Sequence, residues 1–362
     1  MRLPARVSQV AVAALLSASL SAAPPLSAQR GPVARHFPTD SFYIRDWIRG
    51  SAKEPDLFVE PREVAVTRTL AVVFDAGTRE VHALDLNTGA KRFVLSATGE
   101  GPGEFKRPIH IATTPDLIGV LDAATSRISV YSDAGRFLWT TRIPDGGAVE
   151  AMCLLPRGRV RVKFLGAVNA IATIDSSGHT LTRTSLPVPT PLRQAPSFAN
   201  AAYIADGCDD AAMMVIPYFG PAWYRVSDGG AARRFRYAEP GLEAVVTSTV
   251  RRLEKSPGSE TRQERMTTDV SPIARGAMQR GDTVIIEAGA TKRLPYELLD
   301  YYRASDGTYL YSRHLPFTPN ALAITPDGRL IATIIGEESS SVLRLSTTTL
   351  SPREYAKQRR RQ

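Results

Sequence analysis

The chain has 362 residues, with 45 Lys and Arg against 36 Asp and Glu and a formal net charge of +9. Its basic residues are spread among carboxylates and lack the interleaved aromatic residues that stack on bases, which argues against a nucleic-acid partner. After residue 28 no apolar run approaches the roughly 20 residues of a membrane-spanning helix, so no transmembrane segment is expected in the mature chain.

The N-terminus has the pattern of a secretory signal peptide over residues 1–28. Arg2 and Arg6 precede an apolar run over residues 10–20, and small residues end at Ala28. This order predicts cleavage after Ala28, and the alternative is an uncleaved N-terminal anchor. Loss of the two arginines leaves a net charge of 9 − 2 = +7 on the mature chain. We expect that chain in the periplasm or outside the cell.

The first strand expected in the mature chain lies over residues 41–48, which read Ser-Phe-Tyr-Ile-Arg-Asp-Trp-Ile. A loop with the pattern Phe58-x-x-Pro61 follows it. The segment Gly99-Glu-Gly-Pro-Gly-Glu-Phe105, with Pro108 after it, repeats that loop at an offset of 105 − 58 = 47 residues.

The 47-residue offset also aligns three strands that follow each loop. The aligned pairs are Val64 with Ile111, Asp75 with Asp122, Val81 with Ile128, and Leu84 with Tyr131. A period in the forties that is made of short apolar strands is typical of β-propeller blades with four antiparallel strands. The loop glycines are interpreted as structural, because a phosphate-binding glycine motif needs a following helix and none is expected here.

The turns predicted from the sequence give the number of blades. Turns between first and second strands occur six times, at residues 67–69, 115–116, 156–158, 206–209, 280–282 and 326–328. Turns between third and fourth strands occur five times, at residues 87–89, 133–135, 175–178, 228–230 and 306–307. Gly, Asp and Asn recur in them because these residues suit tight turns. We expect residues 41–48 to supply the missing outer strand of the last blade by pairing with residues 342–345.

The expected fold is therefore an all-β, six-bladed β-propeller over residues 29–346, with a basic C-terminal tail over residues 347–362. Repeat folds of this length remain one domain. An insertion over residues 239–272, between blades four and five, is predicted to be helical because apolar residues recur at helical spacing from Leu242 to Leu253. We interpret it either as a lid near the channel mouth or as a helix packed on a blade.

The GEGPGEF segment, an Asp at the end of the second strand and a D-x-G turn together resemble the NHL-repeat superfamily, in particular its exported bacterial six-bladed β-propeller proteins. The resemblance covers residues 40–346 and is strongest in the first two blades. Propeller relatives with enzymatic activity include gluconolactonase-type hydrolases, streptogramin lyase and the peptide-amidating lyase. The resemblance implies that an enzyme of this kind would carry metal ligands or histidine pairs near the channel.

A ligand site is expected on the face that gathers the loops from second to third strands and from one blade to the next. The candidate ligand-binding residues are Asp75, Arg79, Asp122, Arg127, Tyr218, Trp223, Glu287 and Arg293. Asp75 and Asp122 occupy equivalent positions and could together hold a divalent cation. The alternative is an ion pair between each aspartate and the arginine that follows it.

No catalytic centre stands out. The five histidines, at positions 36, 82, 110, 179 and 314, include no i,i+4 pair and no cluster with metal-ligand spacing. His110 lies in an inner strand and could face the channel, although a lone strand histidine is more often a core or surface residue. Apart from a divalent cation at the two aspartates, no cofactor is expected.

Cys153 and Cys208 lie in or beside matching hairpins of adjacent blades, in a chain bound for an oxidising compartment. This placement predicts a disulfide between them, and the alternative is two separately buried thiols.

Taken together, these patterns favour a monomeric, exported, non-catalytic propeller that binds a protein, peptide or glycan through its channel-mouth loops. The alternative is a metal-dependent hydrolase or lyase of the gluconolactonase-like kind. A third hypothesis is a structural module of a surface assembly.

Overall fold

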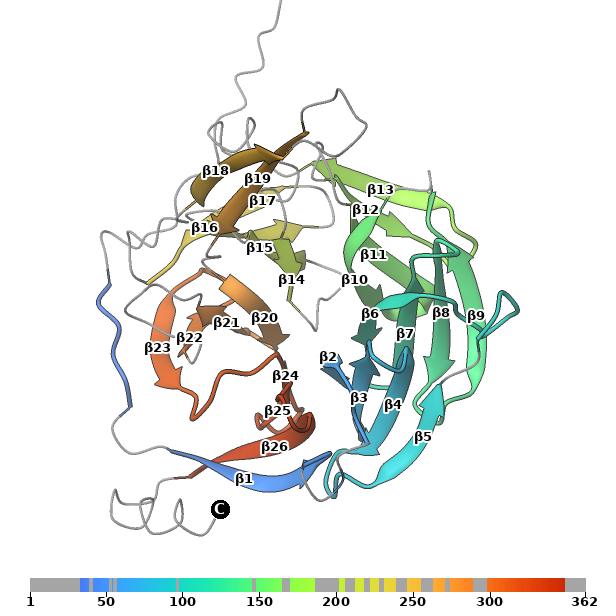
Figure 1. Ribbon diagram of the computed structural model, residues 1–362, viewed down its shortest axis with the longest axis horizontal. Coiled ribbons are helices and arrows are strands. Elements are labelled where there is room, and N and C mark those ends of the chain that lie inside the picture. The colour runs from blue at the N-terminus through green and yellow to red at the C-terminus, as the bar shows by residue number, and fades with distance from the viewer. Residues whose placement is uncertain are drawn as a thin grey trace, which may run out of the picture.

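The computed structural model is a ring of β-sheets around a central channel (Figure 1). The described residues are 33–38, 42–51, 54, 57–95, 98–144, 148–164, 170–185, 202–205, 212–217, 222–227, 231–238, 246–254, 263–270, 274–288 and 298–348. The predicted signal peptide and residues 349–362 of the predicted tail lie outside this set. Within it, no helix is long and apolar enough to cross a membrane.

Six four-stranded antiparallel sheets form the blades. Blades one and two are β2 (Pro61–Val66), β3 (Leu70–Asp75), β4 (Glu80–Asp85), β5 (Lys91–Leu95) and β6 (Pro108–Thr113), β7 (Leu117–Asp122), β8 (Arg127–Ser132), β9 (Phe137–Arg142). Blades three and four are β10 (Val149–Leu155), β11 (Arg159–Phe164), β12 (Ala170–Ile174), β13 (Thr180–Ser185) and β14 (Ala202–Ile204), β15 (Ala212–Pro217), β16 (Ala222–Ser227), β17 (Ala232–Arg236). Blades five and six are β20 (Ala274–Arg280), β21 (Thr283–Ala288), β22 (Leu298–Arg303), β23 (Tyr309–His314) and β24 (Ala321–Ile324), β25 (Leu330–Ile334), β26 (Ser341–Thr348), β1 (Phe42–Arg49). The predicted all-β architecture of six four-stranded blades is confirmed.

The core consists of six apolar clusters, each between two neighbouring blades. The cluster between blades one and two, for example, joins Val72 and Phe74 of β3 to Ile118 and Val120 of β7. Second strands such as β3 are buried along their whole length, because neighbouring blades cover both faces of each sheet. Burial of this kind is the main stabilising contribution to the ring.

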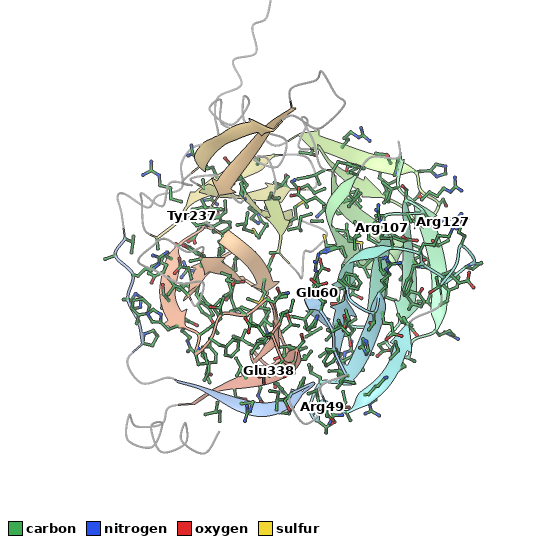
Figure 2. All side chains as sticks on the ribbon, in the orientation of Figure 1. Arg49, Glu60, Arg107, Arg127, Tyr237 and Glu338 are labelled. Atoms are coloured by element: carbon green, nitrogen blue, oxygen red, sulfur yellow. The ribbon has the colours of Figure 1, made fainter. Side chains whose placement is uncertain are left out.

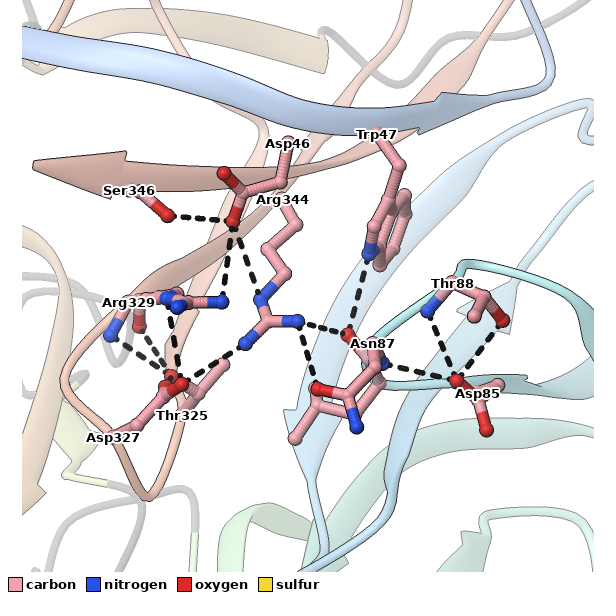
Figure 3. Close-up of polar contacts among 11 residues, drawn as sticks. Asp46, Trp47, Asp85, Asn87, Thr88, Thr325, Asp327, Arg329, Arg344 and Ser346 are labelled. Atoms are coloured by element: carbon pink, nitrogen blue, oxygen red, sulfur yellow. Dashed lines mark hydrogen bonds and ion pairs between the residues drawn. The ribbon is translucent and has the colours of Figure 1, made fainter.

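The last blade is built from both ends of the chain. β1 pairs antiparallel with β26, with Arg45 opposite Leu345 and Ile48 opposite Leu343. At this seam the buried Arg344 of β26 donates to the Leu86 carbonyl (2.9 Å) and to Asp327 Oδ2 (3.0 Å) (Figure 3). Its Nε lies 3.5 Å from Asp46 Oδ2 of β1. One buried cation thus links the N-terminal strand, blade six and blade one.

The GEGPGEF loop is held by its own groups, and its glycines are structural. Gly101 N donates to Glu104 Oε2 (2.8 Å), and a Cβ at Gly99 would lie only 2.0 Å from that oxygen. Gly103 has a φ of +79° and its carbonyl accepts a hydrogen bond from the Tyr131 hydroxyl (2.7 Å). The loop therefore needs glycine both for close approach and for a left-handed backbone.

The predicted helical insertion is wrong. Residues 246–254 and 263–270 form strands β18 (Val246–Glu254) and β19 (Gln263–Val270), paired antiparallel as a separate two-stranded sheet. The apolar spacing predicted a helix, but Val246, Thr249 and Val250 are β-branched, and residues of this type favour strands over helices.

A short N-terminal segment, residues 33–38, lies along the outer strand of blade five (Figure 1). Ser312 N of β23 donates to the His36 carbonyl (3.0 Å), and the Phe37 ring stacks on His314 with centroids 4.6 Å apart. Arg35 forms a bidentate ion pair with Asp300 of β22, with both side chains almost fully buried. We call residues 33–38 the strap.

A buried histidine in blade one predicts a pH dependence of stability. Burial lowers the pKa of His82 below its usual value, and the ring packs edge-on against Phe58. Near pH 6 the unfolded chain therefore binds more protons than the native protein. The free energy of unfolding consequently falls as the pH drops below about 6.5. Below this pH the wild type should lose up to about 1.4 kcal/mol of unfolding free energy per pH unit through His82, and we expect His82→Leu to abolish this contribution. Urea unfolding at pH 7.5 and 5.5 measures it, and an equal acid loss in both proteins would contradict the prediction.

Candidate functional site

The central channel contains a cavity of about 190 Å³. Its walls come from inner strands β2, β6, β14, β20 and β24, together with Glu287 of β21. Most lining residues stand in the middle of these inner strands, and Ile204 is the last residue of β14. The cavity therefore lies within the channel, between the inner strands.

A β-bulge at the start of three inner strands sets the side chains of the cavity. The register shifts between Pro61 and Glu63 in β2, and at the equivalent places before His110 in β6 and Gly276 in β20. A bulge bends the strand and re-aims the residue that follows it. Glu63, His110 and Gly276 follow these bulges and line the cavity, whereas Ala151, which follows the equivalent bulge in β10, is not among the lining residues.

Glu63 and His110 form a pair across blades one and two. Glu63 Oε1 lies 2.7 Å from His110 Nδ1, and Glu63 Oε2 accepts a hydrogen bond from Ile111 N (2.8 Å). On the other side, Asn320 Nδ2 of blade six donates to the carbonyls of Pro61 (3.2 Å) and Arg62 (3.0 Å). Glu63 and Asn320 were not among the site residues predicted from the sequence. The 47-residue offset could have revealed Glu63, since 63 + 47 = 110.

Glu287 is a buried carboxylate at a position that is apolar in blades one and two and is occupied by the buried Lys163 in blade three. It stands opposite Gly276 in the register, as Phe74 stands opposite Glu63 and Leu121 opposite His110. Phe74 and Leu121 belong to the apolar core, whereas Glu287 lines the cavity and is 3% exposed. A Cβ at Gly276 would lie 3.2 Å from Glu287 Oε2. Glycine at this position therefore leaves room beside the carboxylate.

Asp75 and Asp122 are equivalent residues, as predicted, and their carboxylates bind the backbone. Asp75 accepts hydrogen bonds from Val59 N, Glu60 N, Gly77 N and Thr78 N (2.7–3.3 Å). Asp122 repeats three of the four positions 47 residues later, with Lys106 N, Arg107 N and Ala124 N as donors, while Thr125 donates through its hydroxyl. Each aspartate thus ties the loop that enters its blade to the turn after its own strand.

The alternative interpretation, an ion pair between each aspartate and the arginine that follows it, is not observed. Among the described residues, Asp75 forms no ion pair with Arg79 and Asp122 forms none with Arg127. Arg79 is exposed with a φ of +60°, and its equivalent is Ser126 with a φ of +52°. Arg127 instead donates to the Glu100 carbonyl (2.8 Å) of the GEGPGEF loop. The backbone amides, and not the arginine side chains, bind the two carboxylates because the amides are held at fixed positions beside them.

Two further candidate residues, Tyr218 and Arg293, lie outside the described residues. Trp223 was expected in a face loop but lies in β16 with no exposed surface, packed against Phe235 with centroids 4.5 Å apart. A large aromatic ring gains more from burial between blades four and five than from a place in a polar loop. Of the six candidates that the structure describes, Glu287 is the one that lines the cavity.

Cys153 of β10 is disulfide-bonded. The chain has two cysteines, and the other, Cys208, lies outside the described residues. The bonded state of Cys153 agrees with the predicted pairing.

Within the described residues, no group of three or more His, Cys, Asp or Glu could hold a metal ion. Burial raises the pKa of Asp122, but hydrogen bonds from Lys106 N, Arg107 N and Thr125 outweigh this and leave the pKa below its usual value.

We expect Asp122→Ala to lower the free energy of unfolding by about 2–4 kcal/mol, because several buried amides lose a charged acceptor. Denaturant unfolding measures this loss, and Asp116→Ala, at an exposed turn of the same blade, is the matched control. Elemental analysis of both variants adds a second readout. A divalent ion bound to the wild type and lost only in Asp122→Ala would contradict the structural role and support a cation site.

No family model matches the chain, and no curated protein matches it. Similar solved structures include a candidate exported protein from Bacteroides fragilis, with 12% identity over 84% of this chain and 96% of that chain and a TM-score of 0.49. A DUF4221 member from Bacteroides vulgatus has 10% identity, coverage of 86% and 99%, and a TM-score of 0.49. Virginiamycin B lyase from Staphylococcus aureus has 11% identity, coverage of 84% and 99%, and a TM-score of 0.46.

These similarities are too weak to carry an argument about function. The class of protein follows instead from the sheets themselves, which make the chain a six-bladed β-propeller.

Proposed function

We propose that this chain is an exported binding protein that holds its ligand in the cavity of the central channel. The observation that carries the proposal is Glu287, a buried carboxylate that lines a cavity where blades one and two have core residues. An apolar residue also suits this position, since Phe74 and Leu121 occupy it in blades one and two. A concave site with a few convergent polar groups is the usual form of a ligand site.

Export to the periplasm or beyond is supported by the N-terminal pattern of Arg2, Arg6, an apolar run and Ala28. The GEGPGEF loop supports an NHL-like propeller, and we expect it to act as a monomer. Residues Asp75, Asp122, Arg79 and Arg127 would then shape and hold the loops around the mouth, with Tyr218 and Arg293 as further candidates for ligand contact.

Thermal unfolding with and without ligands tests the proposal. A ligand present at a hundred times its Kd stabilises the native state by about 2.7 kcal/mol. We expect at least one compound from a panel of peptides and glycans to raise the Tm of the wild type. Gly276→Leu, which fills the cavity beside Glu287, should abolish that rise, whereas Glu338→Gln on an exposed loop should retain it. An equal rise in the wild type and Gly276→Leu would place the binding elsewhere.

The alternative of a metal-dependent hydrolase or lyase has its own signature. It requires a divalent metal in the purified protein and lactone hydrolysis that disappears when the metal is removed.

A further inference from the structure

The third and fourth strands of blade four carry a cluster of arginines. β16 and β17 contain Arg225, Arg233, Arg234 and Arg236, and the two strands contain no Asp or Glu. β17 is the outermost strand of its sheet, and Tyr237, the residue after it, marks the end of the strand in Figure 2. Arg233 and Arg236 are exposed, whereas Arg225 and Arg234 are half-buried. We call these four residues the arginine cluster.

The charge of the arginine cluster is not balanced within the described part of the chain, where no ion pair involves any of its four members. Outer strands of other blades differ in this respect. Arg49 of β1, at the rim of the ring in Figure 2, forms an ion pair with Glu54 (3.0 Å). Arg92 of β5 forms one with Asp85 (2.5 Å). An excess of unbalanced positive charge on one blade favours an anionic partner.

Two features of the arginine cluster are unfavourable for the fold. Arg225 stands directly opposite Arg233 in the register, and like charges at such positions destabilise a sheet. Arg234 Nε is buried and has no hydrogen-bond partner among the described residues. Charged residues on an outer strand also prevent aggregation, but that protection needs neither facing like charges nor a buried unpaired donor. The pattern therefore favours a role in binding.

The strap shows how an extended segment docks on the outer part of a blade in this ring. Residues 33–38 lie along β23, where Ser312 N donates to the His36 carbonyl (3.0 Å). Arg35 of the strap binds the carboxylate of Asp300, which stands opposite Ser312 in the register. An extended segment thus adds to the outer strand, and its charged side chain meets the opposite charge on the blade.

Blade four has the opposite charge at the equivalent place. Ser227-Asp-Gly229 follows β16 and Ser305-Asp-Gly307 follows β22, which gives an offset of 305 − 227 = 78 residues between the two blades. The same offset aligns Ala222 with Asp300, since 300 − 222 = 78. Ala222 stands opposite Arg236 in the register. Where blade five holds an acid for the basic strap, blade four therefore presents a base.

We propose that blade four binds an extended acidic peptide of a partner protein alongside β17, with Arg234 and Arg236 as the principal contacts. Side chains on one face of a strand recur at every second residue, so acidic residues at alternate positions of the peptide meet the two guanidinium groups. A guanidinium binds a carboxylate through two parallel hydrogen bonds. Among the described strands only β16 pairs with β17, so backbone groups on its other side can bond to the peptide.

The strap of a second copy does not fit this surface, because Arg35 would then meet Arg236. The surface belongs to the outer part of blade four and shares no residue with the lining of the channel cavity. The inference is therefore independent of the proposed function.

Fluorescence anisotropy with the full mature protein and labelled peptides tests this inference. The acidic probe is Thr-Glu-Thr-Glu-Thr-Glu-Thr, and the neutral probe has Gln in place of each Glu. We expect the acidic probe to bind at least about ten-fold more tightly, since charge-assisted contacts to two arginines are worth at least that factor. The double variant Arg234→Gln, Arg236→Gln should bind the acidic probe only as tightly as the neutral one. A third probe of the same composition with its three Glu contiguous should bind the wild type several-fold more weakly.

The matched control is Arg136→Gln, Arg142→Gln, which removes two exposed arginines beside and at the end of β9, the outer strand of blade two. It should leave binding of the acidic probe unchanged within about two-fold. Thermal unfolding of each variant establishes that it is folded, and Arg236→Gln alone decides if the double variant unfolds. Gly276→Leu should bind the acidic probe as the wild type does, which separates this surface from the cavity.

Three outcomes would overturn the inference. The first is equal binding of the acidic probe and either of the other two probes. The second is binding of the acidic probe that the loss of Arg234 and Arg236 does not weaken. The third is no binding of the acidic probe, including the case in which the protein binds phosphatidylglycerol vesicles through these arginines instead.

Discussion

A chain that lacks residues 29–50 is expected to lose its cooperative unfolding transition. The deletion removes β1, so β26 loses its antiparallel partner from Phe42 to Arg49 and becomes an exposed edge. Blade six then has three strands, and the ring opens beside blade one. Propellers rely on such closure because an open edge exposes unpaired backbone groups.

The deletion also removes the partner of a buried charge at the seam. Arg344 Nε lies beside Asp46 Oδ2, and Ser346 Oγ donates to the same carboxylate (2.6 Å). Tyr43, which is buried against the blade-five side of the seam, contributes a hydroxyl 3.3 Å from that of Tyr301. We therefore expect a broad, non-cooperative transition by calorimetry and circular dichroism. Adding a peptide of residues 41–50 should restore a sharp transition in part. An unchanged melting transition in the deleted chain would contradict the closure.

The second large effect is expected from Arg35→Ala in the strap, at about 3–5 kcal/mol of unfolding free energy. Arg35 Nε and NH2 donate to the two oxygens of Asp300 (2.8–3.2 Å). Only 6% of the Arg35 side chain and 2% of the Asp300 side chain are exposed. Removing the arginine would leave a buried carboxylate with Ser312 Oγ (2.6 Å) and the Tyr302 hydroxyl (3.4 Å) as its remaining described side-chain donors.

A second variant separates the orphaned charge from the loss of packing. Asp300→Asn in the Arg35→Ala background removes the uncompensated carboxylate, so the double variant should recover part of the lost stability. Chemical denaturation of the four proteins in this cycle gives the interaction energy. A loss below about 1 kcal/mol for Arg35→Ala, or a double variant less stable than the single one, would show that the strap contributes little.

The repeat made most of the architecture predictable. One offset of 47 residues placed the loops and strands of blades one and two, and the turn signals located the others, because tight turns restrict residue type more than strands do. The hydrogen bonds of Asp75 and Asp122 recur at the same offset. The insertion was mispredicted because a short apolar pattern can fit both the helical period and the strand period. In such a case the content of β-branched residues indicates which of the two forms.

The site was harder to predict than the fold. Its polar groups come from blades one, two, five and six, and they converge only when the ring closes. Glu287 was among the candidates because it lies near a face loop, whereas Glu63 and Asn320 lie in or beside inner strands and carry no local signal. Trp223 illustrates the opposite error, since loop proximity in the sequence did not prevent its burial in β16.

A crystal structure of the mature protein with its most stabilising ligand from the thermal panel tests the central claim most directly. The proposed function predicts ligand density in the cavity of the central channel, in contact with Glu287 and close to the Glu63–His110 pair. Density on an outer blade surface or on the strap, with the cavity unchanged, would contradict the assignment of this cavity as the binding site.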